Sequence, residues 1–177
     1  MSNTTTTIGK WMIWGSWFIF LALLTLFFDD QLAKLINPNQ NVTQNDLNNG
    51  VKEVILKRNK AGHYVSSGFI NEQPVVFLVD TGASDVAIPS IVADTLQLKK
   101  GHRMAYQTAN GTAFGYRTKL NRIRIGNIEL KNIRGGITPG LNINQNHILL
   151  GMTFLKHLEF TQRGNTLTLR QYPNDNG

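Results

Sequence analysis

The sequence contains no cysteine. This absence excludes disulfides, thiolate nucleophiles and the common cysteine-containing zinc sites. It fits the cytosol and equally an oxidising compartment in which unwanted bridges are avoided, so it leaves the location open. Stability must therefore come from packing, and 177 residues allow one ordinary domain with a tail or an anchor but not two sizeable cores.

Histidine is scarce, and its four residues are scattered along the chain: His63, His102, His147 and His157. No two of them have the i, i+4 spacing that places two imidazoles on one face of a helix. We therefore expect no bound metal and no other cofactor.

Acidic residues are also few, because 11 Asp and Glu stand against 18 Lys and Arg, which gives a formal net charge of +7. Nine of the basic residues lie between Lys99 and Arg134, where Glu129 is the single acid. Such a patch can serve nucleic acid or an anionic membrane surface. However, residues 122–125 alternate between basic and apolar side chains, as in a strand with one solvent-exposed face. No aromatic residues lie between the basic residues at positions where they could stack on bases. We predict a solvated sheet face near anionic lipid and no nucleic-acid partner, with a polyanion-binding protein as the alternative.

Near the N-terminus, the segment from Trp11 to Phe28 carries no charge and is rich in Trp, Phe, Leu and Ile. As a helix it would be about 27 Å long, which nearly spans a bilayer core. A cleaved signal peptide is the competing interpretation, but the run is long for one and lacks a small-x-small cleavage site before Asp29. We therefore predict a short tail over residues 1–10 and a transmembrane helix over residues 11–28.

The orientation of this helix is weakly specified, because Lys10 on one side is matched by Lys34 on the other. The N-terminal amine favours a short tail inside and the domain outside the cytoplasm.

Residues 29–50 are polar and rich in amides, and Pro38 interrupts any helix that continues from the membrane. They are predicted to form a coiled tether with a span of about 25 Å, which would let the domain find a partner near the membrane.

From residue 51 to residue 173 the pattern is that of short strands, followed by a tail over residues 174–177. Strands are expected at residues 51–57, 63–70, 75–79, 118–125, 128–133 and 147–150, with short helical segments at 90–96 and 153–157 and hairpins near 110–111 and 163–165. The fully apolar run 75–79 suits a strand that is buried on both faces. These elements predict one small all-β, barrel-like domain.

Asp80 follows this buried run directly, within the segment FLVDTGAS over residues 77–84. A carboxylate at the end of a buried strand is costly unless it is paired or hydrogen-bonded, so its presence needs an explanation. Asp-Thr-Gly alone also fits an ordinary β-turn. The triplet is therefore suggestive, and its context has to decide.

That context resembles the aspartic peptidases of the retropepsin type, in which several apolar residues precede Asp-Thr-Gly-Ala. A second element of that family, an apolar pair followed by Gly and a short helix, is similar to the segment ILLGMTFL over residues 148–155. The resemblance implies a retropepsin-like acid-protease barrel, equivalent to one pepsin-like lobe, in which Leu150 and Gly151 belong to a strand that shields the active-site loop. With the single apolar span, the chain also resembles a bacterial single-pass family, which implies an inner-membrane protein with its peptidase domain in the periplasm.

The resemblance also implies roles for individual residues. Asp80 would be the catalytic carboxylate, and Thr81, Gly82 and Ala83 would support its loop. The hairpin over residues 104–119 would be a flap that closes over an extended peptide, with these substrate-contacting candidates: Tyr106, Ala109, Asn110 and Gly111. Simple packing is the alternative for Tyr106, since a tyrosine on a half-exposed strand usually serves that purpose.

Peptide hydrolysis of this type needs two carboxylates, one as general base toward a water and one protonated to polarise the scissile carbonyl. The chain holds a single Asp-Thr-Gly, so a homodimer that brings two copies of Asp80 together is required. Viral relatives commonly carry an ion pair where this chain has Ser84 and Met152. The sequence thus predicts a membrane-anchored, homodimeric aspartic endopeptidase that acts on peptides or proteins, with a non-catalytic peptide-binding module of the same fold as the alternative.

Overall fold

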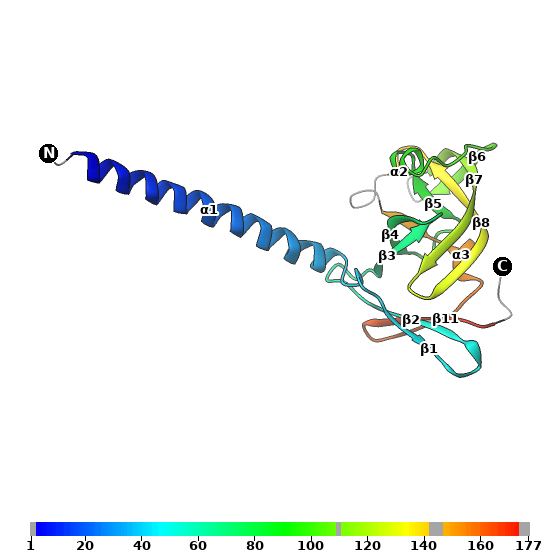
Figure 1. Cartoon of the computed structure of the whole chain (residues 1–177). Coiled ribbons are helices and arrows are strands. Elements are labelled where there is room, and N and C mark those ends of the chain that lie inside the picture. Colours follow the sequence, from blue (N-terminus) through cyan, green and yellow to red (C-terminus); the bar gives the residue numbers. More distant parts are fainter. Residues whose placement is uncertain (1–2, 109–110, 142–146, 174–177) are drawn as a thin grey trace. The chain divides into compact units, whose positions relative to one another are not determined.

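The computed structural model describes residues 3–108, 111–141 and 147–173. The chain divides into two compact units, residues 1–35 and residues 36–177. Its elements, in chain order, are α1 (Asn3–Ile36), β1 (Thr43–Asp46), the 3-10 turn η1 (Asn48–Gly50), β2 (Lys52–Lys57), β3 (Val65–Ile70), β4 (Gln73–Val79), β5 (Val86–Pro89), α2 (Ser90–Thr95), β6 (Arg103–Thr108), β7 (Gly111–Ile125), β8 (Ile128–Thr138), β9 (Ile148–Leu150), α3 (Met152–Leu155), β10 (Glu159–Arg163) and β11 (Thr166–Gln171) (Figure 1).

The first unit is a single helix, α1. Its stretch from Trp11 to Ile36 is long and apolar enough to cross a membrane, and an 18-residue window within this stretch has a mean hydropathy of 1.9. Large side chains such as Trp11 and Phe18 are more than 70% exposed. A helix whose apolar side chains find no protein partner needs another apolar environment. The helix continues through residues 29–36, beyond the predicted span of 11–28.

The second unit contains a closed barrel of six strands. Its strand order is β3-β4-β9-β5-β8-β7, and β3 closes the ring by pairing with β7 through Phe69 opposite Arg124 and Ile70 opposite Ile123. β6 extends beyond the ring as a hairpin with the first half of β7. The predicted all-β, barrel-like domain is therefore confirmed.

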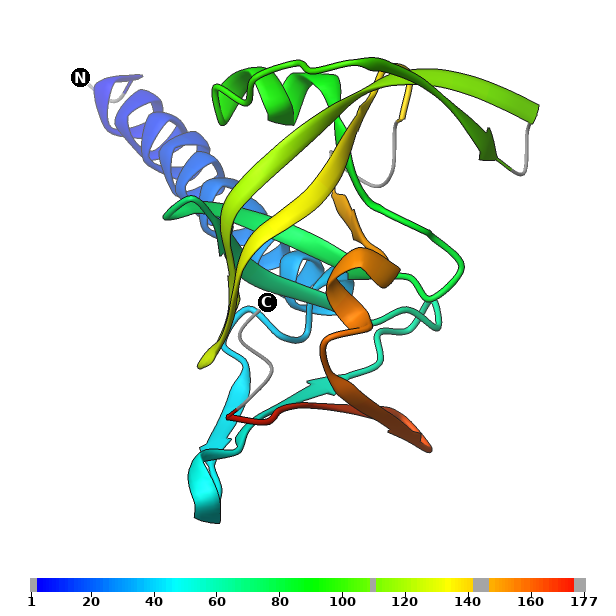
Figure 2. The same cartoon turned by 90° about the vertical axis from the view of Figure 1, so that its right-hand side faces the viewer.

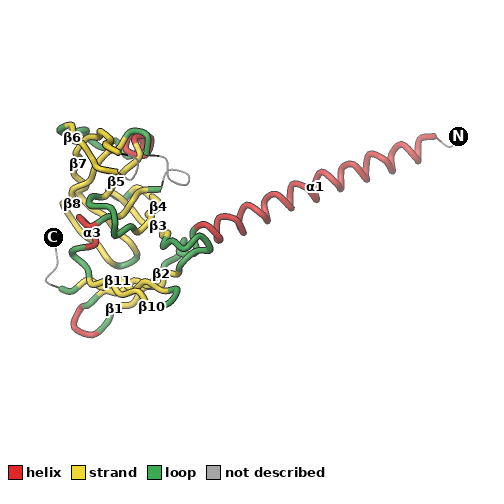
Figure 3. The backbone as a smooth tube through the Cα atoms, turned by 180° about the vertical axis from the view of Figure 1, so that it is seen from behind, coloured by secondary structure: helices red, strands yellow, loops and turns green. Residues whose placement is uncertain are grey.

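A smaller antiparallel sheet, ordered β1-β2-β11-β10, accompanies the barrel. Figure 3 shows its four strands together in one layer at the end of the domain away from the β6–β7 hairpin. Leu56 and Leu169 of this sheet are fully buried and belong to the same core as the barrel residues. The largest fully buried side chains include Phe77, Phe154, Leu56, Ile70, Ile88, Leu120, Ile123 and Ile137.

The segment predicted as a coiled tether has a different structure. Residues 29–36 are helical, and residues 43–46 form β1, which pairs with β2. Between them, Asn39 is 3% exposed. Its amide nitrogen donates to the carbonyl oxygens of Lys57 (2.9 Å) and Val65 (2.7 Å), and its amide oxygen accepts from the N–H of Lys57 (2.7 Å). The folded unit therefore begins at Ile36 and not at Val51, because buried amides satisfy backbone groups that would otherwise be unpaired.

The antiparallel strands β7 and β8 form a ribbon that keeps one pairing register throughout, but near its middle the alternation of core-facing and outward-facing residues is interrupted. Asn132 has a positive φ of 57°, and here the regular pairing between the strands is interrupted. Leu120 and Ile123 consequently both face the core, although they are three residues apart. The outward-facing basic residues of the ribbon therefore form two separate groups, one on each side of the position of Asn132.

Candidate active site

The position of Asp80 is set by two adjacent strands. β4 pairs in parallel with β9, with Val79 opposite Leu150. Directly after this pair, the backbone N–H of Asp80 donates to the carbonyl oxygen of Leu150 at 3.2 Å. The half-buried Asp80 therefore lies at the end of β4, where β4 is paired with β9, another strand of the barrel.

The loop after Asp80 folds back on its carboxylate. The N–H of Gly82 donates to Oδ1 of Asp80 at 2.9 Å, and the N–H of Ala83 donates to the Asp80 carbonyl oxygen at 3.3 Å. A backbone donor fixes the orientation of the carboxylate without a second charged group. Thr81 and Gly82 are exposed in the single chain, whereas Ala83 is half-buried.

The shielding strand and α3 hold the far side of this loop. The N–H of Met152 donates to the carbonyl oxygen of Ala83 (2.8 Å), and the N–H of Thr153 donates to that of Ser84 (3.1 Å). These main-chain bonds connect the loop after Asp80 to the first turn of α3. Figure 2 shows α3, in orange, beside the barrel strands and leading into β10.

Thr153 is a supporting residue that the sequence did not indicate. Its buried hydroxyl accepts from the N–H of Val86 and donates to the carbonyl oxygen of Arg134, both at 3.1 Å. One side chain thereby ties α3 to β5 and β8. The only signal in the sequence is a threonine in an otherwise apolar helical turn, which is too common to have singled it out.

The flap candidates lie on the β6–β7 hairpin. Gly111 begins β7 with a φ of 102°, a conformation that side chains disfavour. Ala109 and Asn110 lie outside the described residues. The hairpin predicted around positions 110–111 is present, since β6 and β7 pair from Arg103 opposite Tyr116 to Thr108 opposite Gly111.

Tyr106 packs within the domain. A β-carbon on Gly115 would stand 2.9 Å from its ring, and one on Gly136 would meet its phenol oxygen, so both glycines make room for it. Within the described residues its buried hydroxyl has no hydrogen-bond partner. Burial raises the pKa of Tyr106, and the negative charge of Asp85 adds to this rise. The packing role describes Tyr106 in the single chain, while a bond to substrate stays a prediction.

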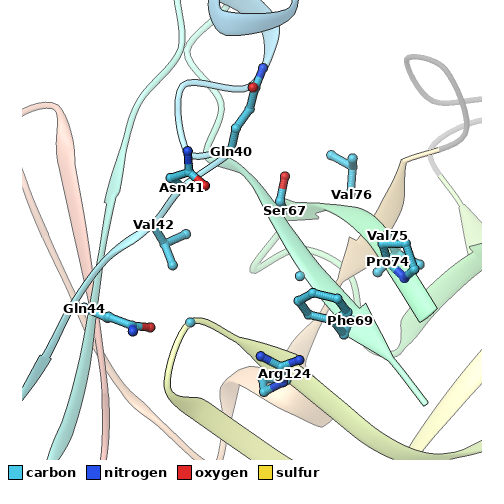
Figure 4. Close-up of a pocket in the computed structure, with 12 residues that line it drawn as sticks. Gln40, Asn41, Val42, Gln44, Ser67, Phe69, Pro74, Val75, Val76 and Arg124 are labelled. Carbon is cyan, nitrogen blue, oxygen red and sulfur yellow. The ribbon is translucent and has the colours of Figure 1, made fainter. Parts of the chain in front are cut away.

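A pocket of about 560 Å³ lies elsewhere on the domain, between the segment 40–44 and strands β3 and β4. Figure 4 shows amide side chains on one side of it and Phe69 with Arg124 on the other. Residues 80–84 are not part of its lining. The pocket is therefore separate from the loop of Asp80.

No group of three or more His, Cys, Asp or Glu residues that could hold a metal ion occurs among the described residues. The carboxylate of Asp80 is thus held by backbone donors and not by a cluster of metal-ligating side chains.

Three comparisons place this geometry among known proteins. A family model described as a gag-polyprotein putative aspartyl protease matches residues 66–157. An uncharacterized protein of a Sinorhizobium species is 30% identical over 165 residues, which are 86% of this chain and 70% of that protein. An uncharacterized protein of Rickettsia prowazekii is 36% identical over 112 residues, 62% of this chain and 47% of that protein.

Among solved structures, the crystal structure of a retropepsin-like aspartic protease from Rickettsia conorii is similar, with a TM-score of 0.53 and 31% identity. The match covers 74% of this chain and 95% of that chain. The family match and the barrel thus show the fold and the family of the aspartic proteases. Within that class, the chain belongs to the retropepsin-like family, and the resemblance stated from the sequence is confirmed.

Proposed function

We propose that the protein is an aspartic endopeptidase whose active site forms when two copies of the chain meet at Asp80. The observation that carries this proposal is the loop itself. It holds one carboxylate in a fixed orientation through Gly82 and leaves Thr81 exposed at the surface of the single chain. One such loop is half of the machinery that the reaction needs.

The reaction follows from two facing carboxylates. One Asp80 is ionised and takes a proton from a water, whose oxygen attacks the carbonyl carbon of the scissile peptide bond. The partner's Asp80 is protonated and transfers its proton to the carbonyl oxygen, which becomes a hydroxyl in the tetrahedral intermediate. The first Asp80 then gives the proton that it took from the water to the leaving nitrogen. The carbon–nitrogen bond breaks as the hydroxyl returns its proton to the partner's Asp80, which restores both carboxyl groups.

A twofold dimer supplies the second carboxylate without any further motif. In such a dimer the same patch of each chain meets itself, and a loop on the axis meets its own copy. The exposed backbone of Thr81 and Gly82 is the surface that the second copy would cover.

An extended peptide is the substrate that suits this arrangement. The β6–β7 hairpin projects beyond the closed barrel, and Figure 1 shows it at the end of the domain away from the small sheet. A hairpin over a cleft can exclude water and align a peptide as an added strand, with main-chain bonds for affinity and side-chain pockets for selectivity.

The decisive variant is Asp80→Asn, with Asp46→Asn as the control, since Asp46 is exposed on β1. The full chain in neutral detergent is incubated with a peptide library over a pH series, and sedimentation is measured on the same samples. Asp80→Asn should abolish cleavage and leave the dimer and the circular dichroism spectrum unchanged, whereas Asp46→Asn should cleave as the parent does. Equal cleavage by parent and Asp80→Asn excludes the proposal.

A mixing experiment tests whether the site is shared. Adding an equal amount of Asp80→Asn chain to a fixed amount of parent should lower cleavage to about half, because random reassortment leaves half of the parent chains in parent dimers. If each chain worked alone, the added variant would leave the rate unchanged. Exchange of subunits is checked separately with two differently labelled parent samples.

We further propose that α1 anchors the protein in a membrane, with the peptidase domain on the periplasmic side of a bacterial inner membrane. The length of the stretch over residues 11–36 and the mean hydropathy of the 18-residue window within it support this. Extraction of membranes at alkaline pH should leave the chain in the pellet, and protease added outside spheroplasts should digest the domain. A mature chain that begins after residue 28 would show instead that α1 is a cleaved signal.

A further inference from the structure

The outer face of the β7–β8 ribbon carries two groups of basic residues that differ in their partners. In the first group, Arg122 stands opposite Lys131, next to the position at Asn132 where the strand pairing is interrupted. Acidic residues contact both members of this pair. Arg122 contacts Glu72 at 2.7 Å and Glu129 at 3.3 Å, and Lys131 lies 4.0 Å from Glu129. This group is neutralised within the protein.

The second group has no such compensation. Lys119 stands directly opposite Arg134, and Arg117 lies on the same outward face of β7. Like charges placed directly opposite on a sheet destabilise it. In the described part of the chain, no ion pair involves Lys119, Arg134 or Arg117. Their repulsion is therefore not offset by any carboxylate described in the structure.

A third segment, the connection from α2 to β6, adds basic residues beside the second group and forms a wall next to it. The connection from α2 to β6 carries Lys99 and Lys100, and of these Lys100 has an acidic partner, Asp94, at 3.3 Å. The connection is attached closely to β7. The N–H of Gly101 donates to the carbonyl oxygen of Arg117 (2.7 Å), and the hydroxyl of Thr118 donates to that of Lys99 (2.9 Å).

Gly101 permits this attachment, because a β-carbon there would stand 2.9 Å from the carbonyl oxygen of Arg117. The result is a pocket of about 420 Å³ whose walls are held by backbone hydrogen bonds. Its lining consists of Lys99, Lys100, Gly101, His102, Arg117, Thr118, Lys119, Asn132 and Arg134. No acidic residue is among them.

We propose that this pocket binds a phosphate group. A phosphate carries up to two negative charges and several acceptor oxygens, and guanidinium groups such as those of Arg117 and Arg134 bind it through paired hydrogen bonds. Bound phosphate would neutralise the facing Lys119 and Arg134, which the protein itself leaves uncompensated. The pocket does not include Asp80 or its loop, so this proposal stands whether or not the chain is a peptidase.

Two sources can present a phosphate here: a soluble phosphate compound or the headgroup of an anionic lipid. The first arm titrates inorganic pyrophosphate into the full chain in neutral detergent, against sodium chloride at equal ionic strength, by calorimetry. The second arm inserts the full chain into bilayer discs of phosphatidylcholine with or without phosphatidylglycerol. It measures hydrogen exchange in residues 99–102, with and without pyrophosphate as competitor.

The ribbon provides a matched pair of variants. Lys119→Gln with Arg134→Gln removes two facing charges inside the pocket, and Arg122→Gln with Lys131→Gln removes two facing charges from the same strands outside it. The first pair should weaken pyrophosphate binding about tenfold or more, and the second by less than about threefold. Circular dichroism of both double variants confirms that the fold is kept.

Either positive arm supports the proposal and assigns the source. Pyrophosphate binding without protection by phosphatidylglycerol indicates a soluble phosphate, whereas protection that pyrophosphate removes indicates a lipid headgroup. The proposal is overturned if neither arm exceeds chloride or phosphatidylcholine. Equal loss in the two double variants overturns it too, because this would show attraction by net charge alone. Tighter binding of a polyglutamate peptide than of pyrophosphate would assign the pocket to carboxylates and overturn it as well.

Discussion

Gly151 lies so close to the backbone of Ala83 that a β-carbon on Gly151 would stand 2.5 Å from the carbonyl oxygen of Ala83. The same atom would also meet the carbonyl oxygen of Asp85. The chain between β9 and α3 can therefore approach the loop of Asp80 only if this position has no side chain. The contact links the loop of Asp80 to the element that precedes α3.

The first prediction concerns this contact. Gly151→Ala should displace the loop of residues 80–85, because the backbone on both sides is held by strand pairing. We expect a loss of about 1–3 kcal/mol in the free energy of unfolding and a larger proportional loss of peptide cleavage than of folded protein. Gly15→Ala is the control for substitution of a glycine with free space around it, because no atom lies within 4 Å of the added carbon and φ is not positive there. A Gly151→Ala protein as active as the parent would show that the loop tolerates the shift.

The second prediction concerns the buried hydroxyl of Thr153. Thr153→Val keeps the shape of the side chain but leaves the N–H of Val86 and the carbonyl oxygen of Arg134 without their partner. Urea unfolding followed by far-ultraviolet circular dichroism should show a loss of about 1–3 kcal/mol. Thr153→Ser keeps the hydroxyl and should recover most of that loss. If Ser and Val behave alike, the methyl group and not the hydroxyl is what matters.

The features that the sequence predicted are those with a strong local signal. The apolar run over residues 75–79 predicted a strand buried on both faces. The strand is present as β4 and ends directly before Asp80, but in this run only Phe77 is buried and the other residues are half-buried. Asn110-Gly111 indicated the turn of a hairpin whose strands are present. Family resemblance, and not periodicity, supplied the pairing of β4 with β9, since contacts across seventy residues leave no local pattern.

Other features could not be predicted from local pattern. β5, over residues 86–89, is too short to show alternation, and β1 is fully exposed, so neither carries a hydrophobic period. The amides of residues 37–49 read as a coil because polar composition indicates solvation. Asn39 is nevertheless buried, and only the tertiary structure supplies the carbonyl and N–H groups of Lys57 and Val65 that satisfy it.

The third prediction follows from Asn39. Asn39→Ala removes three hydrogen bonds to two strands and leaves buried backbone groups unpaired, so it should lower the free energy of unfolding by about 2 kcal/mol or more. All three tryptophans lie in α1, so the transition is followed by circular dichroism and not by tryptophan fluorescence. Asn41→Ala, two positions further and exposed, should stay within about 0.5 kcal/mol of the parent. A parent-like Asn39→Ala would indicate that residues 37–50 are the tether first expected.

The fourth prediction concerns acid. Glu53 on β2 is 7% exposed and stands opposite Arg170 on β11. The hydrogen bond from the amide of Asn45 (3.0 Å), together with that from Arg170 (2.8 Å), lowers the pKa of Glu53 below its ordinary 4.5, although burial opposes the shift. A carboxyl whose pKa is lower in the folded protein binds fewer protons there than in the unfolded chain. Its contribution to stability is complete above pH 4.5 and is lost as the pH falls through the folded pKa.

Glu53→Gln should therefore lower stability at neutral pH and bring its pH dependence closer to flat below about pH 4.5. The measurement is the urea midpoint from about pH 7 to about pH 3, beside Glu159→Gln, which contacts the same Arg170 from an exposed position. Parallel curves for parent and Glu53→Gln would exclude the link. This titration also bears on the proposed activity: below about pH 4.5, a loss of cleavage by the parent should contain an unfolding component that a cleavage assay alone would assign to Asp80. Measuring stability and cleavage on the same samples separates the two.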